Sequence, residues 1–317
     1  MARSSSGRDS EKQARGSGSS SSGGESKKKR KPKQKQKPNQ KNSGSGSRNN
    51  SARAPRTPFQ HIQNLIKWVD LVIEVIDARL PDSTRHPNAD AIFGHKPRLF
   101  IYTKEDLADP EAVRAVLDRI DVPSALLSLK RSSGKDKIIN MAIEATRAQQ
   151  EALVRKGILP RPMRICIVGL PNVGKSSLIN WLIGRKKTKT GNRPGITQGT
   201  QWVRVHPKLE LLDTPGILPP SGFTELTRDK LAALNLLPQS NYEVEPVAEA
   251  ALRLLRERYP ELLERYMEGL ADAEDGFDYF ASKRNLLSQG AVPDRLRACS
   301  IFLSELRDGK VGRLTLD

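Results

Sequence analysis

The chain of 317 residues is poor in cysteine and in long apolar runs. Its two cysteines, Cys166 and Cys299, provide neither a disulfide framework nor the spacing of a metal site, and they fit a reducing compartment. No apolar run reaches 18 residues, which argues against a membrane-spanning helix. The start of the chain lacks the apolar segment of a secretory signal. We expect a cytoplasmic protein, with an organellar location as the alternative, because the first residues are rich in Ser and Arg.

Residues 1–56 lack aromatic side chains and hold few apolar ones, and their acidic residues are Asp9, Glu11 and Glu25, against 16 Lys and Arg. Such a segment cannot bury enough apolar surface to offset its conformational entropy, so we expect a disordered basic tail. Its dense run of cations at 27–37 predicts salt-dependent, sequence-independent affinity for nucleic acid. A nuclear-localisation signal and a solubilising tail are alternatives, and we favour attachment to RNA or to the ribosome.

The rest of the chain divides by pattern into two regions. Apolar runs typical of buried strands occur at 71–76, 98–102, 124–127, 163–168, 202–205 and 209–212. Helical patterns occur among them at 60–68, 110–119, 135–156 and 176–183, and later, without further strands, at 225–236, 244–258, 260–269 and 293–307. This alternation predicts a doubly wound, mostly parallel α/β domain at 57–220 and an all-α domain at 221–317.

A glycine-rich loop follows the strand predicted at 163–168 and precedes the helix predicted at 176–183. Its sequence, GLPNVGKS at 169–176, is that of a phosphate-binding loop, in which backbone N–H groups and a helix N-terminus surround the phosphates. Lys175 is expected to reach the β- and γ-phosphates, and the Ser176 hydroxyl to ligate Mg²⁺. The residues expected at the phosphates are Asn172, Val173, Gly174, Lys175, Ser176 and Ser177.

Two later segments carry the other residues that a γ-phosphate site needs. Asp213 follows the strand at 209–212 and is expected to hold the hydration shell of Mg²⁺, while the Gly216 N–H is expected to contact the γ-phosphate. The segment at 192–200, between the phosphate loop and that strand, contains two threonines, and we expect Thr197 to close over Mg²⁺, with Thr200 as the alternative. Lys175 and Thr197 are the expected catalytic residues.

Recognition of guanine requires a carboxylate that accepts hydrogen bonds from the ring N1–H and the exocyclic amine. The Thr-Lys-x-Asp pattern that supplies it is formed here by Thr103, Lys104 and Asp106, directly after the strand at 98–102. Ser128 and Leu129 follow the strand at 124–127 and match the loop that contacts the guanine O6. These motifs precede the phosphate loop, so the order is circularly permuted. A ligand site of a doubly wound sheet depends on which loops meet beyond the carboxyl ends of its strands, so the order of these loops in the chain does not prevent the site from forming.

With these motifs in this order, the chain resembles the circularly permuted YlqF/RbgA-type ribosome-assembly GTPases over about residues 65–317. Asp77-Ala-Arg79, the segment at 193–202 and the segment at 302–317 support the resemblance. It implies binding of GTP and GDP, Mg²⁺, hydrolysis of GTP, and a role in maturation of the large ribosomal subunit. We expect the chain to be a monomer when it is not on the ribosome. Contact with rRNA is implied through the helical domain, with the tail as a further contact. Asn172 also resembles a residue that lets K⁺ assist hydrolysis in related GTPases; a plain turn residue is the alternative.

The chain departs from the family pattern at two points. Thr103 stands where many members have Asn, which predicts weaker bracing of the phosphate loop. A Pro-Gly-His-Met-like segment, whose His is implicated in hydrolysis, is missing before the first strand, and His61 reads instead as a helix-surface residue. In Ras-like enzymes a Gln after the Asp-x-x-Gly segment orients the attacking water, and here Ile217 follows Gly216 instead. We therefore expect slow intrinsic turnover that the pre-ribosome stimulates. For Asp77 and Arg79, a structural ion pair and a contact with rRNA or the nucleotide loop remain open.

Two functions follow from these observations. The first is a GTPase switch in assembly of the large ribosomal subunit. The alternative is a GTP-binding rRNA scaffold with little or no intrinsic hydrolysis. A GTPase of tRNA modification or transport is disfavoured, because no additional catalytic motif is visible.

Overall fold

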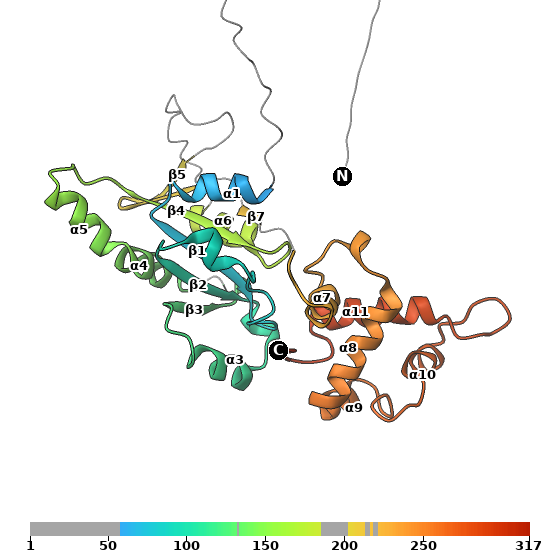
Figure 1. Ribbon diagram of the computed structural model, residues 1–317. Coiled ribbons are helices and arrows are strands. Elements are labelled where there is room, and N and C mark those ends of the chain that lie inside the picture. The colour runs from blue at the N-terminus through green and yellow to red at the C-terminus, as the bar shows by residue number, and fades with distance from the viewer. Residues whose placement is uncertain (1–57, 132, 185–201, 213–215, 218–220) are drawn as a thin grey trace, which may run out of the picture. The chain divides into compact units, whose positions relative to one another are not determined.

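A mostly parallel sheet of seven strands forms the first part of the computed structural model, which describes residues 58–131, 133–184, 202–212, 216–217 and 221–317 (Figure 1). The strands are β1 (Leu71–Asp77), β2 (Arg98–Thr103), β3 (Ser124–Leu127), β4 (Met163–Gly169), β5 (Trp202–His206), β6 (Leu209–Leu212) and β7 (Gly216–Ile217). Their hydrogen-bonded order is β3-β2-β1-β4-β6-β5, with β7 beside β4. Only β5 is antiparallel to its neighbour, β6.

The sheet order shows how the early and late parts of the chain combine. The strands that precede β4 in the chain, β1 to β3, lie on one side of it, and the later strands β6 and β5 lie on the other. All seven residues of β1 are buried, as expected of a strand covered on both faces. The carboxyl ends of the parallel strands therefore meet at one edge, as the circularly permuted arrangement predicts.

Helices accompany the sheet in the order α1 (Pro58–Ile66), α2 (Ala89–Phe93), α3 (Pro110–Leu117), α4 (Lys135–Ala145), α5 (Arg147–Arg155) and α6 (Lys175–Ile183). The single helix predicted at 135–156 is wrong, because the structure has two helices that meet at Thr146. The Thr146 hydroxyl donates to the Ala142 carbonyl at 2.9 Å, a local bond that competes with the regular helix pattern. The short helix α2 was not predicted.

From residue 221 the chain is helical, and its described residues form no strand beyond one isolated bridge between Leu287 and Pro293. The helices are α7 (Glu225–Ala233), α8 (Val244–Arg258), α9 (Pro260–Tyr266), α10 (Gly276–Lys283) and α11 (Arg295–Asp308), the orange and red elements of Figure 1. Phe277 and Phe302 are buried in their core, with ring centroids 5.3 Å apart. The all-α prediction is confirmed, although α10 was missed.

The structure does not test the predictions of a basic tail and of a domain boundary near residue 220. The basic tail lies outside the described residues. Residues 53–317 form one compact unit, so the boundary between 57–220 and 221–317 rests on the change of secondary structure and stays a prediction. Within the described residues, no helix combines the length and the apolar character needed to cross a membrane.

Candidate nucleotide-binding site

The phosphate loop leaves the sheet where β4 ends. Gly169 has a φ of +153°, and a Cβ placed on it would lie 2.6 Å from the Val75 carbonyl oxygen of β1, so only glycine fits between these strands. Asn172 and Gly174 also have positive φ values, of 59° and 104°. Gly174 is the N-cap of α6, and this sequence of turns brings the loop to the helix N-terminus. The predicted order of strand, loop and helix is confirmed.

A cleft of about 430 Å³ opens beside the phosphate loop. It is lined by Arg79, Lys104, Asn172, Gly174, Lys175, Ser176, Ser177, Leu234, Asn235 and Arg307. Four of these side chains are cationic and none is acidic, which favours an anionic ligand. The cleft thus combines predicted loop residues with residues from beyond 221 that the sequence did not single out.

Lys175 is 6% exposed, and its ammonium donates to the Leu170 carbonyl at 2.5 Å, within its own loop. Burial lowers the pKa of Lys175 to about 8. Ser176 and Ser177 are exposed to the cleft at the first turn of α6. The N-terminus of a helix and a cation therefore face the same volume, an arrangement that suits phosphate.

Thr103, at the end of β2, braces the phosphate loop directly. Its hydroxyl lies 2.5 Å from the Val173 carbonyl oxygen and 3.1 Å from that of Ile76, and both oxygens are in place to accept its proton. A Cβ on Gly174 would lie 3.6 Å from the Thr103 hydroxyl and 3.7 Å from Leu129 Cδ1. The Thr-Lys-x-Asp segment, the loop after β3 and the phosphate loop thus converge. Bracing exists without Asn at this position, although its strength relative to Asn stays untested.

Replacing Thr103 with Val should lower the free energy of unfolding by about 1–3 kcal/mol, because the buried Val173 carbonyl loses its donor while the side-chain volume is kept. Affinity for GDP should fall as the loop loosens. Urea denaturation and nucleotide titration would measure the two effects. Thr103→Ser retains the hydroxyl and serves as the control. Equal stability and affinity of the Val variant and the native chain would contradict the bracing role.

Asp106 lies in a 3-10 turn, η1 (Glu105–Leu107), just beyond β2. Its carboxylate accepts a hydrogen bond from the Ser128 hydroxyl at 2.9 Å and pairs with Lys130 at 2.8 Å. Partial burial would raise the pKa of Asp106, but the bonds from Lys130 and Ser128 outweigh it and lower that pKa. The predicted base-recognition residues are therefore brought together, and the carboxylate is held ionised as an acceptor.

Asp77 and Arg79 form a buried ion pair at the end of β1. They are 0% and 2% exposed, and the guanidinium binds both carboxylate oxygens, at 3.0 and 2.9 Å. Lys104 Nζ adds a second cation at 2.7 Å from Asp77. Burial opposes ionisation of Asp77, but Arg79 and Lys104 prevail and hold its pKa well below the ordinary value. Of the two interpretations left open, the geometry favours the structural ion pair.

Lys104 belongs to the base motif and also lines the cleft, and its pair with Asp77 holds it there. It has a left-handed backbone conformation, with a φ of 59°. Burial lowers its pKa, and the neighbouring Asp77 carboxylate partly offsets that effect. Arg79 continues the connection through Nη1, which donates to the Arg307 carbonyl at the end of α11 at 3.1 Å. The ion pairs beside the cleft are therefore linked to the helical region by a hydrogen bond.

Asn172 contacts the helical region as well. Its side-chain amide donates to the carbonyl of Asn235, just past α7, at 2.8 Å. Arg307 lies nearby, where its guanidinium donates to the carbonyls of Ala232 and Ala233 at the end of α7. The phosphate loop is therefore linked to α7 and α11, which no sequence pattern indicated.

The remaining predicted residues are only partly described. Gly216 and Ile217 form β7, which pairs in parallel with Val168 and Gly169, so the Gly216 backbone lies beside the start of the phosphate loop. Thr197, with its alternative Thr200, and Asp213 lie outside the described residues. His61 belongs to α1, and its side chain is likewise outside the described set. Cys166 is buried in β4, as expected of a core residue.

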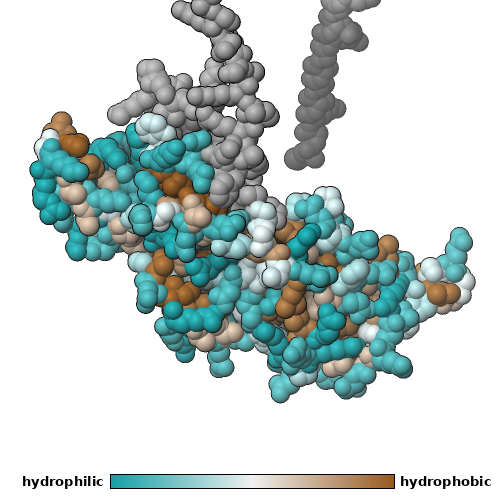
Figure 2. Space-filling model, in the orientation of Figure 1, coloured by the Kyte–Doolittle hydropathy of each residue, from teal (hydrophilic) through white to brown (hydrophobic). Residues whose placement is uncertain are grey.

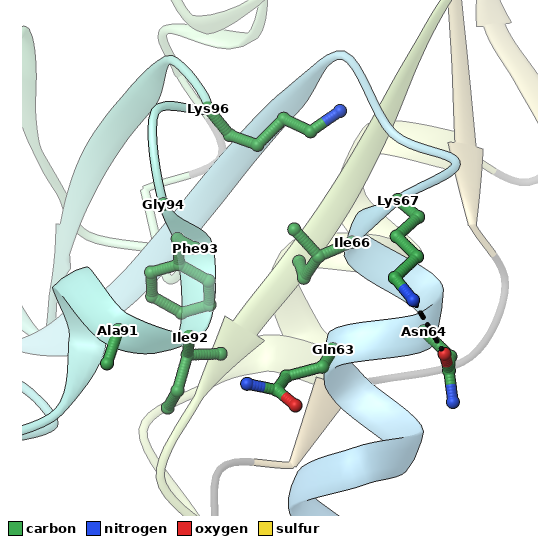
Figure 3. A pocket seen from close by; sticks show the side chains of 9 residues that line it. All are labelled: Gln63, Asn64, Ile66, Lys67, Ala91, Ile92, Phe93, Gly94 and Lys96. Atoms are coloured by element: carbon green, nitrogen blue, oxygen red, sulfur yellow. Dashed lines mark hydrogen bonds between the residues drawn. The ribbon is translucent and has the colours of Figure 1, made fainter.

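A second cleft, of about 540 Å³, lies between α1 and α2 (Figure 3). It is lined by Gln63, Asn64, Ile66, Lys67, Ala91, Ile92, Phe93, Gly94 and Lys96. Lys67 precedes β1 and Lys96 precedes β2, so this cleft is at the amino ends of those strands, away from the loops described above. It contains none of the predicted site residues.

Comparison with known proteins agrees with this geometry. A family model described as "50S ribosome-binding GTPase" matches residues 164–264. The chain is similar to ribosome biogenesis GTPase A of Priestia megaterium, with 37% identity over 265 residues that cover 81% of this chain and 92% of the relative. The Thermotoga maritima protein of that name is 32% identical over 258 residues, covering 81% and 89%.

Two solved structures resemble the fold of this chain. One is the GDP-bound structure of TM YlqF, with a TM-score of 0.60, 28% identity, and coverage of 81% of this chain and 98% of that one. The other is GNP-bound YlqF from T. maritima, with a TM-score of 0.57, 28% identity, and coverage of 81% and 96%. Both likenesses extend through the sheet and the helical region.

Proposed function

We propose, from the premise that the chain belongs to the ribosome biogenesis GTPase A (YlqF/RbgA) family, that its GTPase cycle acts as a switch on the assembling large ribosomal subunit. The chain is a GTP- and GDP-binding GTPase of ribosome biogenesis. The observation that carries the proposal is the hydrogen bond from the Thr103 hydroxyl to the Val173 carbonyl of the phosphate loop, with Leu129 close to Gly174 as well. It joins the base-recognition loops to the phosphate loop despite their inverted order in the chain.

In the proposed complex each predicted residue has a separate task. Asp106 accepts hydrogen bonds from guanine, and Ser128 orients that carboxylate. Leu129 contributes the backbone N–H at the guanine O6. Lys104 and Thr103 brace the base side against the phosphate loop. Beyond them, the residues proposed to bind or neutralise the phosphates are Asn172, Val173, Gly174, Lys175, Ser176, Ser177 and Gly216.

Mg²⁺ is the proposed metal of the complex. Ser176 fits this role, because its exposed hydroxyl faces the cleft beside Lys175 and a hydroxyl oxygen is a donor that Mg²⁺ accepts. Thr197 and Asp213 are the further proposed ligands. Among the described side chains no cluster of three His, Cys, Asp or Glu residues could hold a metal by itself. Such a site would thus depend on nucleotide oxygens and water. We also propose K⁺ as an auxiliary cation at Asn172.

Intrinsic hydrolysis should be slow, because Ile217 has no polar group with which to orient water. We propose that a group of the pre-ribosomal particle supplies this function, with Lys175 and Thr197 stabilising the transferred phosphoryl group. The missing Pro-Gly-His-Met-like segment motivates the alternative function, a GTP-binding scaffold with little hydrolysis of its own, while the presence of Lys175, Ser176 and Asp213 argues against it.

Contact with rRNA is proposed through the tail and the helical domain. The balance of cationic and acidic residues shows which of the two suits RNA better. Residues 221–317 hold 13 Lys and Arg against 17 Asp and Glu, so this region can bind RNA only through local clusters. The tail, with 16 cations against three acids, is the stronger candidate. Residues 151–200 add ten cations against the single acid Glu151. Apolar side chains also reach the surface in and after α5, where Val154 and Leu159 are exposed, and Figure 2 shows apolar residues among the hydrophilic ones on this face of the molecule.

The particle is proposed to be a large-subunit precursor in the cytoplasm, with an organelle as the alternative location, and the chain is proposed to be monomeric away from it. The test combines nucleotide titration with single-turnover hydrolysis, with and without purified large-subunit precursors. We expect binding of GDP and GTP in preference to ATP, and faster hydrolysis on addition of the particles. Equal binding of ATP would reject the guanine site. Absence of stimulation would favour the scaffold.

A further inference from the structure

Residues 309–317, here called the strap, follow α11 and run along the loops at the carboxyl ends of β1 and β2. The Leu314 N–H donates to the Leu107 carbonyl at 3.1 Å, and the Leu316 N–H donates to the Arg79 carbonyl at 2.9 Å. Leu314 and Leu316 are buried. The strap therefore binds the backbone of the same two loops that carry the base motif and the Asp77–Arg79 ion pair.

Arg313 of the strap brackets the turn that carries Asp106. Its Nε donates to the Ala108 carbonyl at 2.8 Å, and its Nη2 donates to the Glu105 carbonyl at 3.0 Å. Together with the bond from Leu314, the strap occupies the carbonyls of three of the four residues from 105 to 108. Asp106 lies between the two carbonyls that the guanidinium binds.

The turn is short, and few hydrogen bonds of its own hold it. It is a 3-10 turn of three residues, a form with poor hydrogen-bond geometry, and it follows Lys104 in a left-handed conformation. Two backbone bonds close it: the Leu107 N–H donates to the Lys104 carbonyl at 2.9 Å, and the Ala108 N–H donates to the Glu105 carbonyl at 3.4 Å. Ser128 and Lys130 hold the carboxylate of Asp106, and the strap adds three hydrogen bonds to the backbone of the turn, two of them from Arg313. Bidentate recognition tolerates only small displacement of the carboxylate.

We propose that Arg313 is a positioning residue for guanine selectivity, acting through the backbone of residues 105–108. This inference rests on the proposed role of Asp106 as the guanine acceptor. A side chain from beyond the last helix thus helps to decide which base the sheet edge accepts. The ligand concerned is the guanine base, whereas the phosphates are proposed to bind in the cleft beside the phosphate loop.

The experiment measures affinities of the full chain for GDP and ADP with Arg313→Ala and Arg313→Lys. Loss of two hydrogen bonds that steer one carboxylate should weaken GDP binding about three- to tenfold, with ADP binding unchanged. Lys can reach one carbonyl, so it should recover part of the loss. In an Asp106→Ala background, Arg313→Ala should have no further effect on GDP affinity. Lys310→Ala is the matched control, because Lys310 is exposed and pairs only with Glu305 among the described residues.

The possible outcomes distinguish failure of the role of Arg313 from failure of the proposed guanine site. If folded Arg313 variants keep the native preference for GDP over ADP, the positioning role is rejected while the guanine site stands. If GDP and ADP affinity fall together, Arg313 supports the fold generally and the inference also fails. If the native chain shows no preference for GDP over ADP, the proposed function fails and the role of Arg313 fails with it. Thermal unfolding of each variant identifies chains that do not fold.

Discussion

Asp106→Asn should exchange guanine for xanthine as the preferred base. The native carboxylate is placed to accept two charge-assisted hydrogen bonds, each contributing about 1.5–3 kcal/mol, so their loss should weaken GDP binding by roughly 10²–10⁴-fold. The Asn amide would instead face the exocyclic amine of guanine with a donor. Xanthine carries a carbonyl at that position and can accept from the amide, so xanthosine diphosphate should bind the variant better than GDP.

Competition titrations with GDP, xanthosine diphosphate and ADP would measure this exchange. Glu111→Gln is a suitable control, since it also removes one carboxylate but at an exposed position of α3. The Ser128 hydroxyl can still bond to the Asn side chain, whereas the ion pair with Lys130 is lost. A variant that still preferred GDP over xanthosine diphosphate would show that another residue reads the base.

The second large effect is expected from Arg79→Met. The substitution leaves the buried Asp77 carboxylate with Lys104 as its remaining ionic partner, and breaking a buried pair in this way costs about 3–5 kcal/mol. It also removes the hydrogen bond to the Arg307 carbonyl. Urea denaturation should show this loss in the free energy of unfolding. Arg119→Met is the matched control, because its pair with Asp82 is 58% and 49% exposed and contributes about 0–1 kcal/mol.

The same pair predicts a dependence on acid. Burial alone would favour protonated Asp77, but Arg79 and Lys104 hold its pKa below the ordinary 3.8. A depressed pKa contributes stability above the ordinary value and loses it as the pH falls below about 4. The native chain should therefore lose stability more steeply below this pH than Arg79→Met. Parallel acid denaturation curves for the two chains would contradict the ion pair as a source of stability.

Sequence patterns predicted the sheet and its loops well, because buried strands and glycine-rich turns are local signals. The run at 163–168 and the loop after it left few alternatives, and Thr103 to Asp106 followed a strand as expected. The break at Thr146 was missed, since one side-chain hydroxyl decides it. Helix α10 escaped notice because it begins at Gly276, a poor helix former.

The contacts between distant segments could not be predicted. Arg313 and Leu314 reach residues 105–108 across some 200 positions, and no periodicity encodes such a pairing. Asn172 was interpreted from its place in the phosphate loop, while its bond to Asn235 depends on how α7 packs. Arg79 was noted, and only the structure gives its burial. Tertiary packing of unrelated segments decides each of these contacts.

The inverted order of the strands has a consequence for synthesis of the chain. During translation β1, β2 and β3 emerge first, and the free edge of β1 has no partner until β4 is made about 90 residues later. Such an open edge invites association with other chains. The turn that carries Asp106 gains its hydrogen bonds from Arg313 even later, because Arg313 follows Ala108 by 205 residues. A nascent chain can therefore contain every nucleotide-binding motif before the strap at 309–317, which supports the turn of Asp106, has been synthesised.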